Sequence, residues 1–539
     1  MFALLSVGIR TKRRVQDTFM MKGSEILIKE LRRHGVDIVF GYPGASILSL
    51  YDELSRSDIR HILPADERGA AFMANGYARA TNKVGVCIAT SGPGATNLVT
   101  GIADAFSDSV PLVVITGNVS VDMLGHDGFQ EVDTTGITMP ITKYNYIVKD
   151  VKDLSFAVSE AFYVATSGRK GPVLIDIPAN VFDETCDYVP AEITEKNTDL
   201  VDMTEVADAA KIINESTRPL IYAGGGVVAS GTKNLVTKLS RILKAPIGVS
   251  MRGVGVTDFD NEYFIGVSTA RNTLAKAALK DADLLISVGA RFSSKATEKT
   301  FYNKKLKLLH LDIDAAEIDK NHQSDARIVG DLSNTLPLLL SRVIEKDHAW
   351  FNAQPDKNER LSTVQCMINC LCRHFGRDAY VTTDVGQHQL YVTNYYDFSL
   401  GGRLITSAGL GAMGFGIGAA VGTAFATGKR VLYVTGDGSF NMSFNELITI
   451  RRYSLPVVTV IFDNSSLGMI YEIQKKKYGG NVVDSVLLDG VDYVRLANSF
   501  GIPAYRAETV RELDGVLSSI DLNSPAVIDL KLKKQENIL

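Results

Sequence analysis

The chain has 539 residues, which is too long for one compact core and predicts about three domains. Its 57 Lys and Arg nearly balance its 61 Asp and Glu, so the formal net charge is only −4. Without a basic excess or a long apolar run, we expect neither a nucleic-acid partner nor a membrane span, and small-molecule chemistry in the cytoplasm becomes the default.

The first residues and the cysteines support a cytoplasmic protein. In residues 1–20 an apolar stretch precedes the basic residues, the wrong order for a signal peptide, so we predict an N-terminal extension. The five cysteines form an odd set, expected to be reduced thiols: Cys87, Cys186, Cys366, Cys370 and Cys372. Cys366 and Cys370 share one face of a predicted helix, where a zinc site and core thiols are alternatives. No second cluster or histidine pair completes a zinc site, so we favour core thiols.

From Gly23 onward, amphipathic helical stretches alternate with short apolar runs that end in glycine-rich turns. Examples are SEILIKELRRHG followed by VDIVFGYPG, and later VGVCIATSGPGATN and PLVVITGN. This alternation is typical of a parallel α/β sheet, and it recurs twice more along the chain. We therefore predict an α/β fold with three open parallel-sheet domains at 21–190, 191–350 and 351–539. Ligand sites are expected beyond the carboxyl ends of the strands.

The first predicted domain contains the segment LPADERGAAFMANGYARATN, in which Glu67 directly precedes a helix. A glutamate at this place is ordinarily a solvated charge that favours the helix N-terminus. Two further segments follow, TSGPGATN at 90–97 and GFQEVD at 128–133. In the second domain, three glycines at 224–226 suggest a nucleotide site, but they lack the GxGxxG spacing and an acidic partner. A simple glycine turn is therefore the preferred interpretation.

The third domain has the strongest motif. Asp437 lies between two glycines directly after the apolar strand RVLYVT, and Asp463 and Asn464 end the strand VVTVIF. Both strand ends point at one crevice, where carboxylate and amide oxygens suit Mg²⁺ bridging two phosphates. Flanking glycines let backbone N–H groups approach phosphate oxygens, and a helix beginning near Phe444 would add its dipole.

The spacing of GDG and DN resembles the thiamine-diphosphate enzyme superfamily, and the chain resembles the acetolactate synthase large (catalytic) subunit family from Lys22 to Ile528. The three domains would then be the pyrimidine-binding, central and diphosphate-binding domains. The resemblance implies that Mg²⁺ is bound by the side chains of Asp437 and Asn464 and by the carbonyl of Ser466. It also implies a set of residues that contact thiamine diphosphate: Gly386, Gln387, His388, Gly411, Met413, Gly438, Ser439, Leu467, Gly468 and Met469.

The resemblance gives Glu67 the catalytic role of contacting the cofactor's pyrimidine ring. In the family this glutamate and the diphosphate site come from different subunits, which implies a homodimer or tetramer with active sites at the subunit interface. Phe129, Gln130 and Lys143 correspond to family positions that line the 2-oxo acid pocket. Lys143 equally fits a surface lysine. A regulatory subunit is not identified.

The sequence departs from the family pattern at positions that, in the family, contact the second substrate or FAD. Ile473 stands where biosynthetic members carry a tryptophan, and Lys295 in GARFSSK at 289–295 replaces an arginine. The segment VSTARN at 267–272 lacks the family's FAD-contacting glycine, methionine and histidine, while Arg291 and the stretch LDID at 311–314 are retained. The sequence therefore leaves FAD binding open.

The predicted function is decarboxylation of pyruvate or a similar 2-oxo acid and transfer of the resulting two-carbon unit to a second carbonyl. The alternatives are a 2-oxo acid decarboxylase or acyl-transferring relative that uses the same cofactor, and a catalytically silent homologue that serves as a scaffold or regulatory subunit. Intact Glu67, Asp437 and Asn464 argue against the silent homologue. The acceptor and the pathway cannot be named from the sequence.

Overall fold

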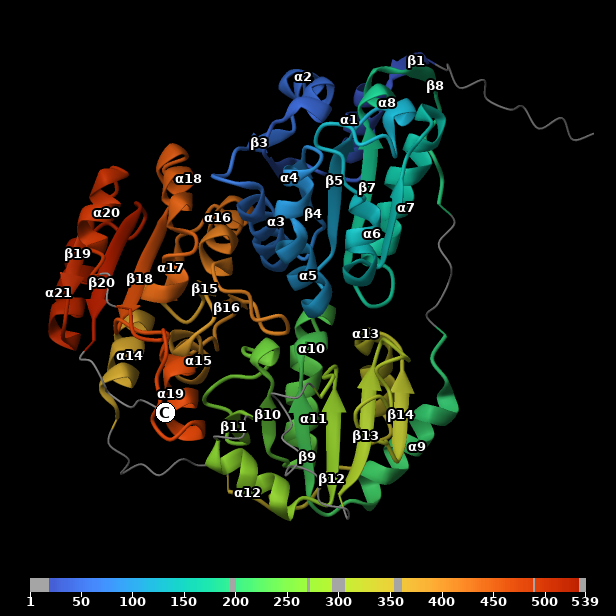
Figure 1. Ribbon diagram of the computed structural model, residues 1–539. Helices are drawn as coiled ribbons and strands as arrows, with labels where there is room; N and C mark the ends of the chain where they lie inside the picture. The colour runs from blue at the N-terminus through green and yellow to red at the C-terminus, as the bar shows by residue number, and fades with distance from the viewer. Residues whose placement is uncertain are drawn as a thin grey trace, which may run out of the picture.

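The computed structural model describes residues 19–193, 200–268, 272–292, 306–352, 361–487 and 490–532. It contains three six-stranded sheets, each in its own part of the chain, as predicted (Figure 1). All strand pairs within these three sheets are parallel, for example β17 with β18. Within the described ranges, no helix is long and apolar enough to cross a membrane.

The first domain is built on the sheet order β3-β2-β4-β5-β7-β6. Its strands are β2 (Ile38–Gly41), β3 (Arg60–Ile62), β4 (Gly85–Ala89), β5 (Leu112–Asn118), β6 (Tyr144–Ile147) and β7 (Pro172–Pro178). Its helices are α1 (Gly23–Arg33), α2 (Leu48–Arg56), α3 (Glu67–Thr81), α4 (Pro93–Asn97), α5 (Val99–Asp108), α6 (Thr134–Thr138), α7 (Leu154–Thr166) and α8 (Ala179–Asp183). A separate antiparallel pair joins β1 (Phe19–Lys22) to β8 (Thr185–Tyr188), so the predicted extension already enters a strand at residue 19.

The central domain has the sheet order β11-β10-β9-β12-β13-β14. Its strands are β9 (Pro219–Ala223), β10 (Ile247–Val249), β11 (Phe264–Val267), β12 (Leu284–Val288), β13 (Lys307–Asp312) and β14 (Ala326–Val329). Its helices are α9 (Met203–Glu215), α10 (Gly225–Ser230), α11 (Lys233–Leu243), α12 (Thr273–Asp281) and α13 (Leu332–Leu340). The domain boundaries near 190 and 350 stay a proposal; they fall between β8 and α9 and between α13 and α14.

The third domain has the sheet order β16-β15-β17-β18-β20-β19. Its strands are β15 (Tyr380–Thr383), β16 (Arg403–Thr406), β17 (Val431–Gly436), β18 (Val457–Asp463), β19 (Ala504–Ala507) and β20 (Ala526–Lys531). Its helices are α14 (Thr363–Phe375), α15 (Gln387–Tyr395), α16 (Phe415–Thr427), α17 (Asp437–Phe440), α18 (Leu447–Arg452), α19 (Gly468–Lys477), α20 (Tyr493–Ser499) and α21 (Val510–Ser519).

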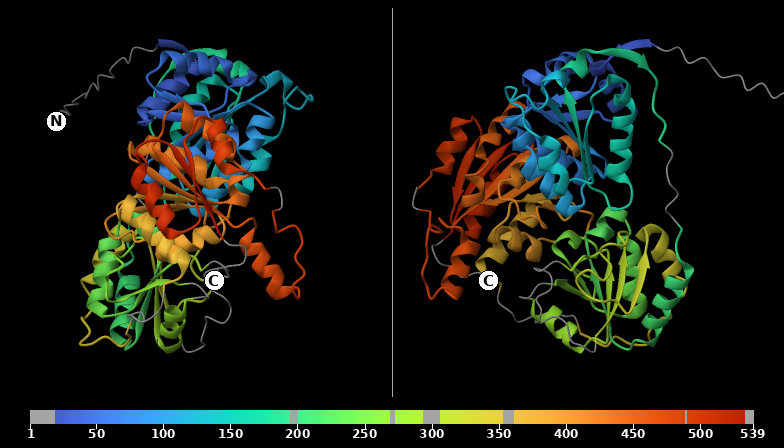
Figure 2. Two further views of the ribbon diagram at one scale, coloured as in Figure 1. Left: turned by 90° about the vertical axis from the view of Figure 1, so that its left-hand side faces the viewer. Right: turned by 45° about the vertical axis from the view of Figure 1, so that its right-hand side comes forward.

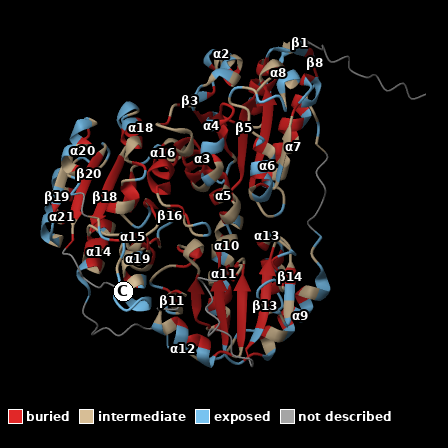
Figure 3. Cartoon of the chain, viewed as in Figure 1, coloured by how far each residue is buried: buried red, intermediate tan, exposed pale blue. Residues whose placement is uncertain are grey.

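The central strands of each sheet are buried on both faces, because helices cover both sides. Every residue of β5, β7 and β18 is buried, and Figure 3 shows the strands as a buried layer inside partly exposed helices. In the sequence such strands are continuous apolar runs and not alternating apolar and polar residues, so they could be predicted.

Helices α3 and α16 join the first domain to the third (Figure 1). Their backbones approach so closely that a Cβ on Gly422 would lie 1.9 Å from the carbonyl oxygen of Met73. A Cβ on Gly76 would likewise lie 2.3 Å from the carbonyl oxygen of Ala419. The glycines of FGIGAAVG therefore permit this crossing, and α3, which begins at Glu67, is fixed against the third domain.

All three domains meet at a buried cluster of charges. Arg79 of α3 donates to Asp104 and Asp108 of α5 at 3.0 and 2.9 Å. Arg252 of the central domain lies 3.4 Å from Asp108. Ser407, which follows β16, donates to the same Asp104 carboxylate. The cluster ties the orientation of each domain to the others. Figure 2 shows the three domains from two further sides.

We expect Gly422→Ala to lower the melting temperature, because the added methyl group would overpack the α3–α16 crossing at a cost of about 1–3 kcal/mol. Gly515→Ala is the matched control, since Gly515 lies in α21 with open space around its Cα. There the same change should raise stability by about 0.4–1 kcal/mol. Differential scanning calorimetry of both variants measures the difference. Equal melting temperatures would contradict the account of the crossing.

Candidate active site

The predicted diphosphate loops converge at the switch point of the third sheet. From β15 the chain moves outward to β16 and then returns to β17 on the other side of β15, so a crevice opens between the ends of β15 and β17. The loop at Gly386 and Gln387 follows β15, and Asp437 follows β17. Asn464 follows β18, the neighbour of β17, as Gly436 pairs with Phe462.

Asp437 is buried at the head of α17, which starts directly after β17. Its Oδ1 accepts from the backbone N–H of Gly438 at 2.8 Å, and its Oδ2 accepts from the N–H of Ser466 at 3.1 Å. Burial and then the adjacent carboxylate of Asp463 raise the pKa of Asp437 to about 7. The helix start at this crevice is therefore α17, and the predicted start near Phe444 is corrected to a 3-10 turn, Phe444–Glu446, that precedes α18.

Asn464 connects this carboxylate cluster to the loop after β15. Its Oδ1 accepts from the N–H and the hydroxyl of Ser466, and its Nδ2 donates to Gln387 Oε1 at 3.1 Å. Gln387 in turn donates to Glu472 of α19 at 2.6 Å. A Cβ on Gly468 would lie 2.0 Å from Gln387 Oε1, so the start of α19 packs directly on this amide.

His388 is a neutral, fully buried imidazole behind the same loop. Burial lowers its pKa to about 3, despite a hydrogen bond to the Asp384 carbonyl. Its ring packs on Gly386 and Gly436, where an added Cβ would lie 2.5 and 2.8 Å from ring atoms. Within the described residues, His388 Nε2 is buried without a hydrogen-bond partner. Because the one N–H of the neutral ring is used toward the Asp384 carbonyl, this nitrogen is a hydrogen-bond acceptor.

Met413 lies in the turn before α16, and a carboxylate holds that turn in place. Asp384 at the end of β15 accepts from the N–H of Gly416 at 2.8 Å and from the hydroxyls of Tyr433 and Thr435. Burial raises the pKa of Asp384. Gly414, next to Met413, has φ of 81°, which favours glycine. Asp384 therefore positions the predicted methionine, a role that the sequence motif did not reveal.

The remaining predicted cofactor residues lie around these groups. Ser439 is buried and donates to the Val385 carbonyl at 3.1 Å. A Cβ on Gly438 would lie 2.4 Å from a methyl group of Leu467. Met469 occupies the first turn of α19, and Gly411 has φ of 75° in the loop before Met413.

In the first domain, Glu67 lies at the start of α3, capped by Asp66, whose side chain accepts from Gly69 N–H. Its Oε2 accepts from Asn97 Nδ2 at 2.9 Å, and a Cβ on Gly94 would lie 3.2 Å from its other oxygen. These residues face the switch point between β2 and β4. Among the described residues, no hydrogen bond joins Glu67 to the Asp437 cluster of the same chain.

The substrate residues lie at two different edges of the first sheet. Gln130 has φ of 61° and packs on Gly92, whose Cβ would lie 2.9 Å from its Cα, while Phe129 beside it is 87% exposed. Lys143 precedes β6 at the amino edge of the sheet and donates to the carbonyl of Ser167 at 2.6 Å and to that of Val164. The structure does not bring Lys143 close to Gln130. The role of Lys143 in the substrate pocket therefore stays a prediction, and the contact that the structure shows is the capping of a helix.

Sequence reasoning missed Glu446, a carboxylate that fixes the entry to α3. Both of its oxygens accept from Ala65 N–H at 3.1 Å, and one accepts from Thr449 at 2.6 Å. A Cβ on Gly69 would lie 1.8 Å from Glu446 Oε1. Burial raises the pKa of Glu446 to about 7. The predicted Glu67 is thus positioned through a residue of the third domain, nearly 400 positions later, which no local pattern could reveal.

Comparison with known proteins agrees with this geometry. Family models of thiamine pyrophosphate enzymes match the N-terminal TPP binding domain at residues 21–137, the central domain at 206–339 and the C-terminal TPP binding domain at 384–530. The probable acetolactate synthase large subunit of Methanocaldococcus jannaschii is 38% identical, with 96% of this chain and 93% of that protein covered. The chain belongs to the acetolactate synthase large-subunit family.

Other relatives in this family are similarly close. The isozyme 2 large subunit of Escherichia coli is 37% identical, with 96% of this chain and 97% of that protein covered. The large subunit of Porphyra purpurea is also 37% identical, with coverage of 96% and 92%. The match spans both the Glu67 segment and the Asp437 crevice, so the whole site lies within the family resemblance.

The central domain contains the glycine turn at 224–226 and the segments where the sequence departs from the family pattern. Gly226 N–H donates to the Gly289 carbonyl at 3.0 Å, and a Cβ on Gly226 would lie 2.8 Å from Gly289 Cα. The three glycines therefore allow two loops to touch, which agrees with a glycine turn. Arg291 donates to the Ser107 carbonyl of the first domain. Residues 269–271 and 293–295, including Lys295, lie outside the described residues, so FAD binding stays an open prediction.

We expect Glu446→Gln to flatten the pH dependence of stability. The folded-state pKa near 7 lies above the usual value of 4.5, so the folded protein retains this proton at pH values where the unfolded chain loses it. The stability from this group is therefore present at low pH and lost as the pH rises through about 7. Melting temperatures at about pH 5.5 and about pH 8 measure the slope. An identical slope in wild type and variant would contradict the assignment.

Proposed function

We propose that this chain is the catalytic subunit of an acetolactate synthase that uses thiamine diphosphate and Mg²⁺. It decarboxylates pyruvate, or a similar 2-oxo acid, and transfers the two-carbon unit to a second carbonyl. The observation that carries the proposal is the pair of buried carboxylates, Asp437 and Asp463, at the crevice of a chain whose relatives are named acetolactate synthases. Those names favour the carboligase over the decarboxylase alternative.

The donor set fits Mg²⁺. Asp437, Asn464 and the Ser466 carbonyl are hard oxygen donors. Lys531 already pairs with the neighbouring Asp463, so a divalent cation would balance the remaining negative charge of Asp437. The same crevice fits a diphosphate. The amide of Gln387 and the N–H groups around Gly438 supply donors on an edge where backbone can approach closely.

When bound, thiamine diphosphate supplies a thiazolium carbon that stabilises the negative charge left by decarboxylation. The chain's own contribution begins with Glu67, which we place against the pyrimidine ring, where its carboxylate exchanges a proton with a ring nitrogen. Asn97 holds one Glu67 oxygen and leaves the other to make this contact. Met413, held in its turn through Asp384, would contact the bound cofactor.

We further propose a homodimer, or a tetramer built from dimers, in which Glu67 of one subunit faces the Asp437 crevice of another. Two facts support this assembly. No hydrogen bond among the described residues links Glu67 with Asp437 within one chain. The loop after β5 leaves Phe129 87% exposed, as expected for a side chain that a second subunit covers.

The acceptor pocket is proposed at α19. Ile470 and Ile473, one turn apart on this helix, are both 49% exposed, and the helix starts on Gln387 at the crevice. Isoleucine gives less contact area than the tryptophan of the biosynthetic relatives. We therefore propose a weaker preference for 2-oxobutyrate over pyruvate as acceptor.

Incubation of the protein with pyruvate, thiamine diphosphate and Mg²⁺ should yield acetolactate and carbon dioxide. Competition between pyruvate and 2-oxobutyrate, with products identified by mass spectrometry, measures acceptor preference. Ile473→Trp should shift that preference toward 2-oxobutyrate, while Ile448→Trp, at an exposed position on α18, is the matched control. Release of acetaldehyde alone would contradict the carboligase assignment.

We expect Glu67→Gln to lower kcat by at least about 100-fold, because the amide cannot exchange the proton at the ring nitrogen. Calorimetric titration should still give cofactor affinity near that of the wild type. Glu53→Gln, on the surface of α2, is the matched control and should keep full activity. Wild-type turnover in Glu67→Gln would refute the role of this residue.

A further inference from the structure

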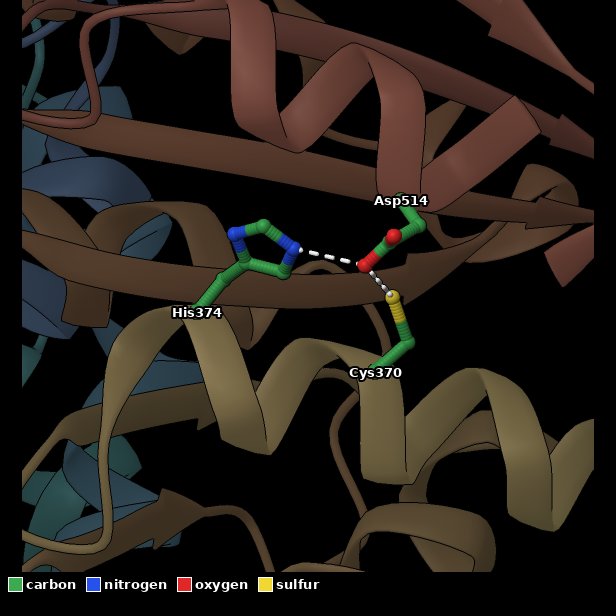
Figure 4. Close-up of side chains that lie close together, drawn as sticks. All are labelled: Cys370, His374 and Asp514. Atoms are coloured by element: carbon green, nitrogen blue, oxygen red, sulfur yellow. Dashed lines mark hydrogen bonds and ion pairs between the residues drawn. The ribbon is translucent and has the colours of Figure 1, made fainter. Parts of the chain in front are cut away.

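A second cluster of metal-binding side chains lies between α14 and α21, outside the crevice. Cys370 and His374 are one turn apart on α14, and Asp514 faces them from α21 (Figure 4). Asp514 Oδ1 is 2.9 Å from His374 Nε2 and 3.4 Å from Cys370 Sγ. One ligand atom from each residue lies within 4.8 Å of the others. The sequence analysis did not identify this cluster, because Asp514 is 140 positions from His374.

The cluster lies on the flank of the third sheet, between α14, which precedes β15, and α21, which follows β19. His374 lies in the last turn of α14, which leads into the amino end of β15 at Tyr380. The crevice lies beyond the carboxyl end of the same strand. Cofactor binding and proton transfer therefore give no reason for these three residues to converge.

We propose that Cys370, His374 and Asp514 bind one Zn²⁺ ion, with water as the fourth ligand. A thiolate, an imidazole and a carboxylate form a mixed sulfur, nitrogen and oxygen set, which suits Zn²⁺ and does not suit Mg²⁺. The thiolate and carboxylate together balance the charge of the ion. Half of the Asp514 side chain, 48%, is exposed, so an ion and its water can enter from solvent.

The geometry needs only side-chain rotations to hold the ion. With metal–ligand distances of about 2.0–2.3 Å, tetrahedral ligand atoms lie roughly 3.3–3.6 Å apart. The distance of 3.4 Å between Cys370 and Asp514 already falls in this range. The 2.9 Å distance between His374 and Asp514 must open by a few tenths of an ångström. Both helices carry their ligands on the faces that pack together, so their backbones can stay in place.

The ion must displace the hydrogen bonds that the cluster makes without it. Asp514 accepts from His374 and Cys370, and also from the guanidinium of Arg373 at 3.4 Å. Burial, and then the hydrogen bond to Asp514, raise the pKa of the Cys370 thiol to about 11. Zn²⁺ therefore has to replace the thiol proton, which leaves to solvent. Arg373 is 62% exposed and can turn outward to water.

The bound ion would act as a structural link between α14 and α21. These two helices pack on the same side of the third sheet, which also carries the crevice, so the link would stabilise that domain. With three protein ligands and one water the site keeps one open position, and the proposed effect of the ion is on the packing of the two helices.

The test uses the full-length chain, freed of metal under reducing conditions and then saturated with Mg²⁺ and thiamine diphosphate to fill the crevice. Titration with Co²⁺ should give a sulfur-to-cobalt charge-transfer band and the visible bands of a tetrahedral site at one equivalent per chain. Zn²⁺ should abolish these bands and raise the melting temperature. Absence of a thiolate–cobalt band in the wild type would overturn the proposal.

Substitutions of the three residues test which of them bind the ion. His374→Gln and Asp514→Asn, at partly exposed positions that should not unfold the chain, are expected to weaken Zn²⁺ binding at least about tenfold. Cys370→Ser should remove the charge-transfer band. Cys366→Ser, one turn earlier on the same helix, is the matched control and should keep it. Wild-type Zn²⁺ affinity in Asp514→Asn and His374→Gln would show that the triad is only a hydrogen-bonded contact and would overturn the proposal.

Discussion

The proposed cofactor site depends on two buried carboxylates that a parallel sheet brings close together. Because β17 and β18 are neighbours, Asp437 and Asp463 emerge side by side at the same edge, and each is only about 2% exposed. Backbone N–H groups of Gly438 and Ser466 offset part of the negative charge on Asp437, but its pKa is still raised. Lys531 pairs with Asp463, and a divalent cation at this edge would balance the remaining charge of Asp437 and bind a diphosphate.

The position of Glu67, the proposed catalytic residue, is fixed by long-range packing. Glycines in α3 and α16 let the two helices cross at backbone contact, and Glu446 of the third domain accepts from the backbone just before Glu67. The buried charges around Asp104 and Asp108 attach the central domain to the same framework. The three domains thus behave as one support for a site whose parts lie far apart in sequence.

Much of this arrangement could be predicted from the sequence, because parallel strands buried on both faces leave continuous apolar runs and their carboxyl ends point to ligand sites. The three sheets and the GDG and DN loops were found in this way. The roles of Asp384, Glu446 and Asp514 were not found in this way. Each of these residues contacts groups that are distant along the chain, so no local sequence pattern indicates the contact. Lys143 shows the reverse limit: a motif match placed it in a pocket, while its ammonium group caps the end of α7.

The central claim is most directly tested by calorimetric titration of thiamine diphosphate into the protein, with and without Mg²⁺, for the wild type and for Asp437→Ala. We predict tight binding to the wild type that requires Mg²⁺, and loss of the Mg²⁺-dependent affinity in Asp437→Ala. Asp521→Ala, in an exposed turn, should bind like the wild type. Equal affinity with and without Mg²⁺, or an unchanged affinity in Asp437→Ala, would contradict the claim that Asp437 holds the cofactor through a cation.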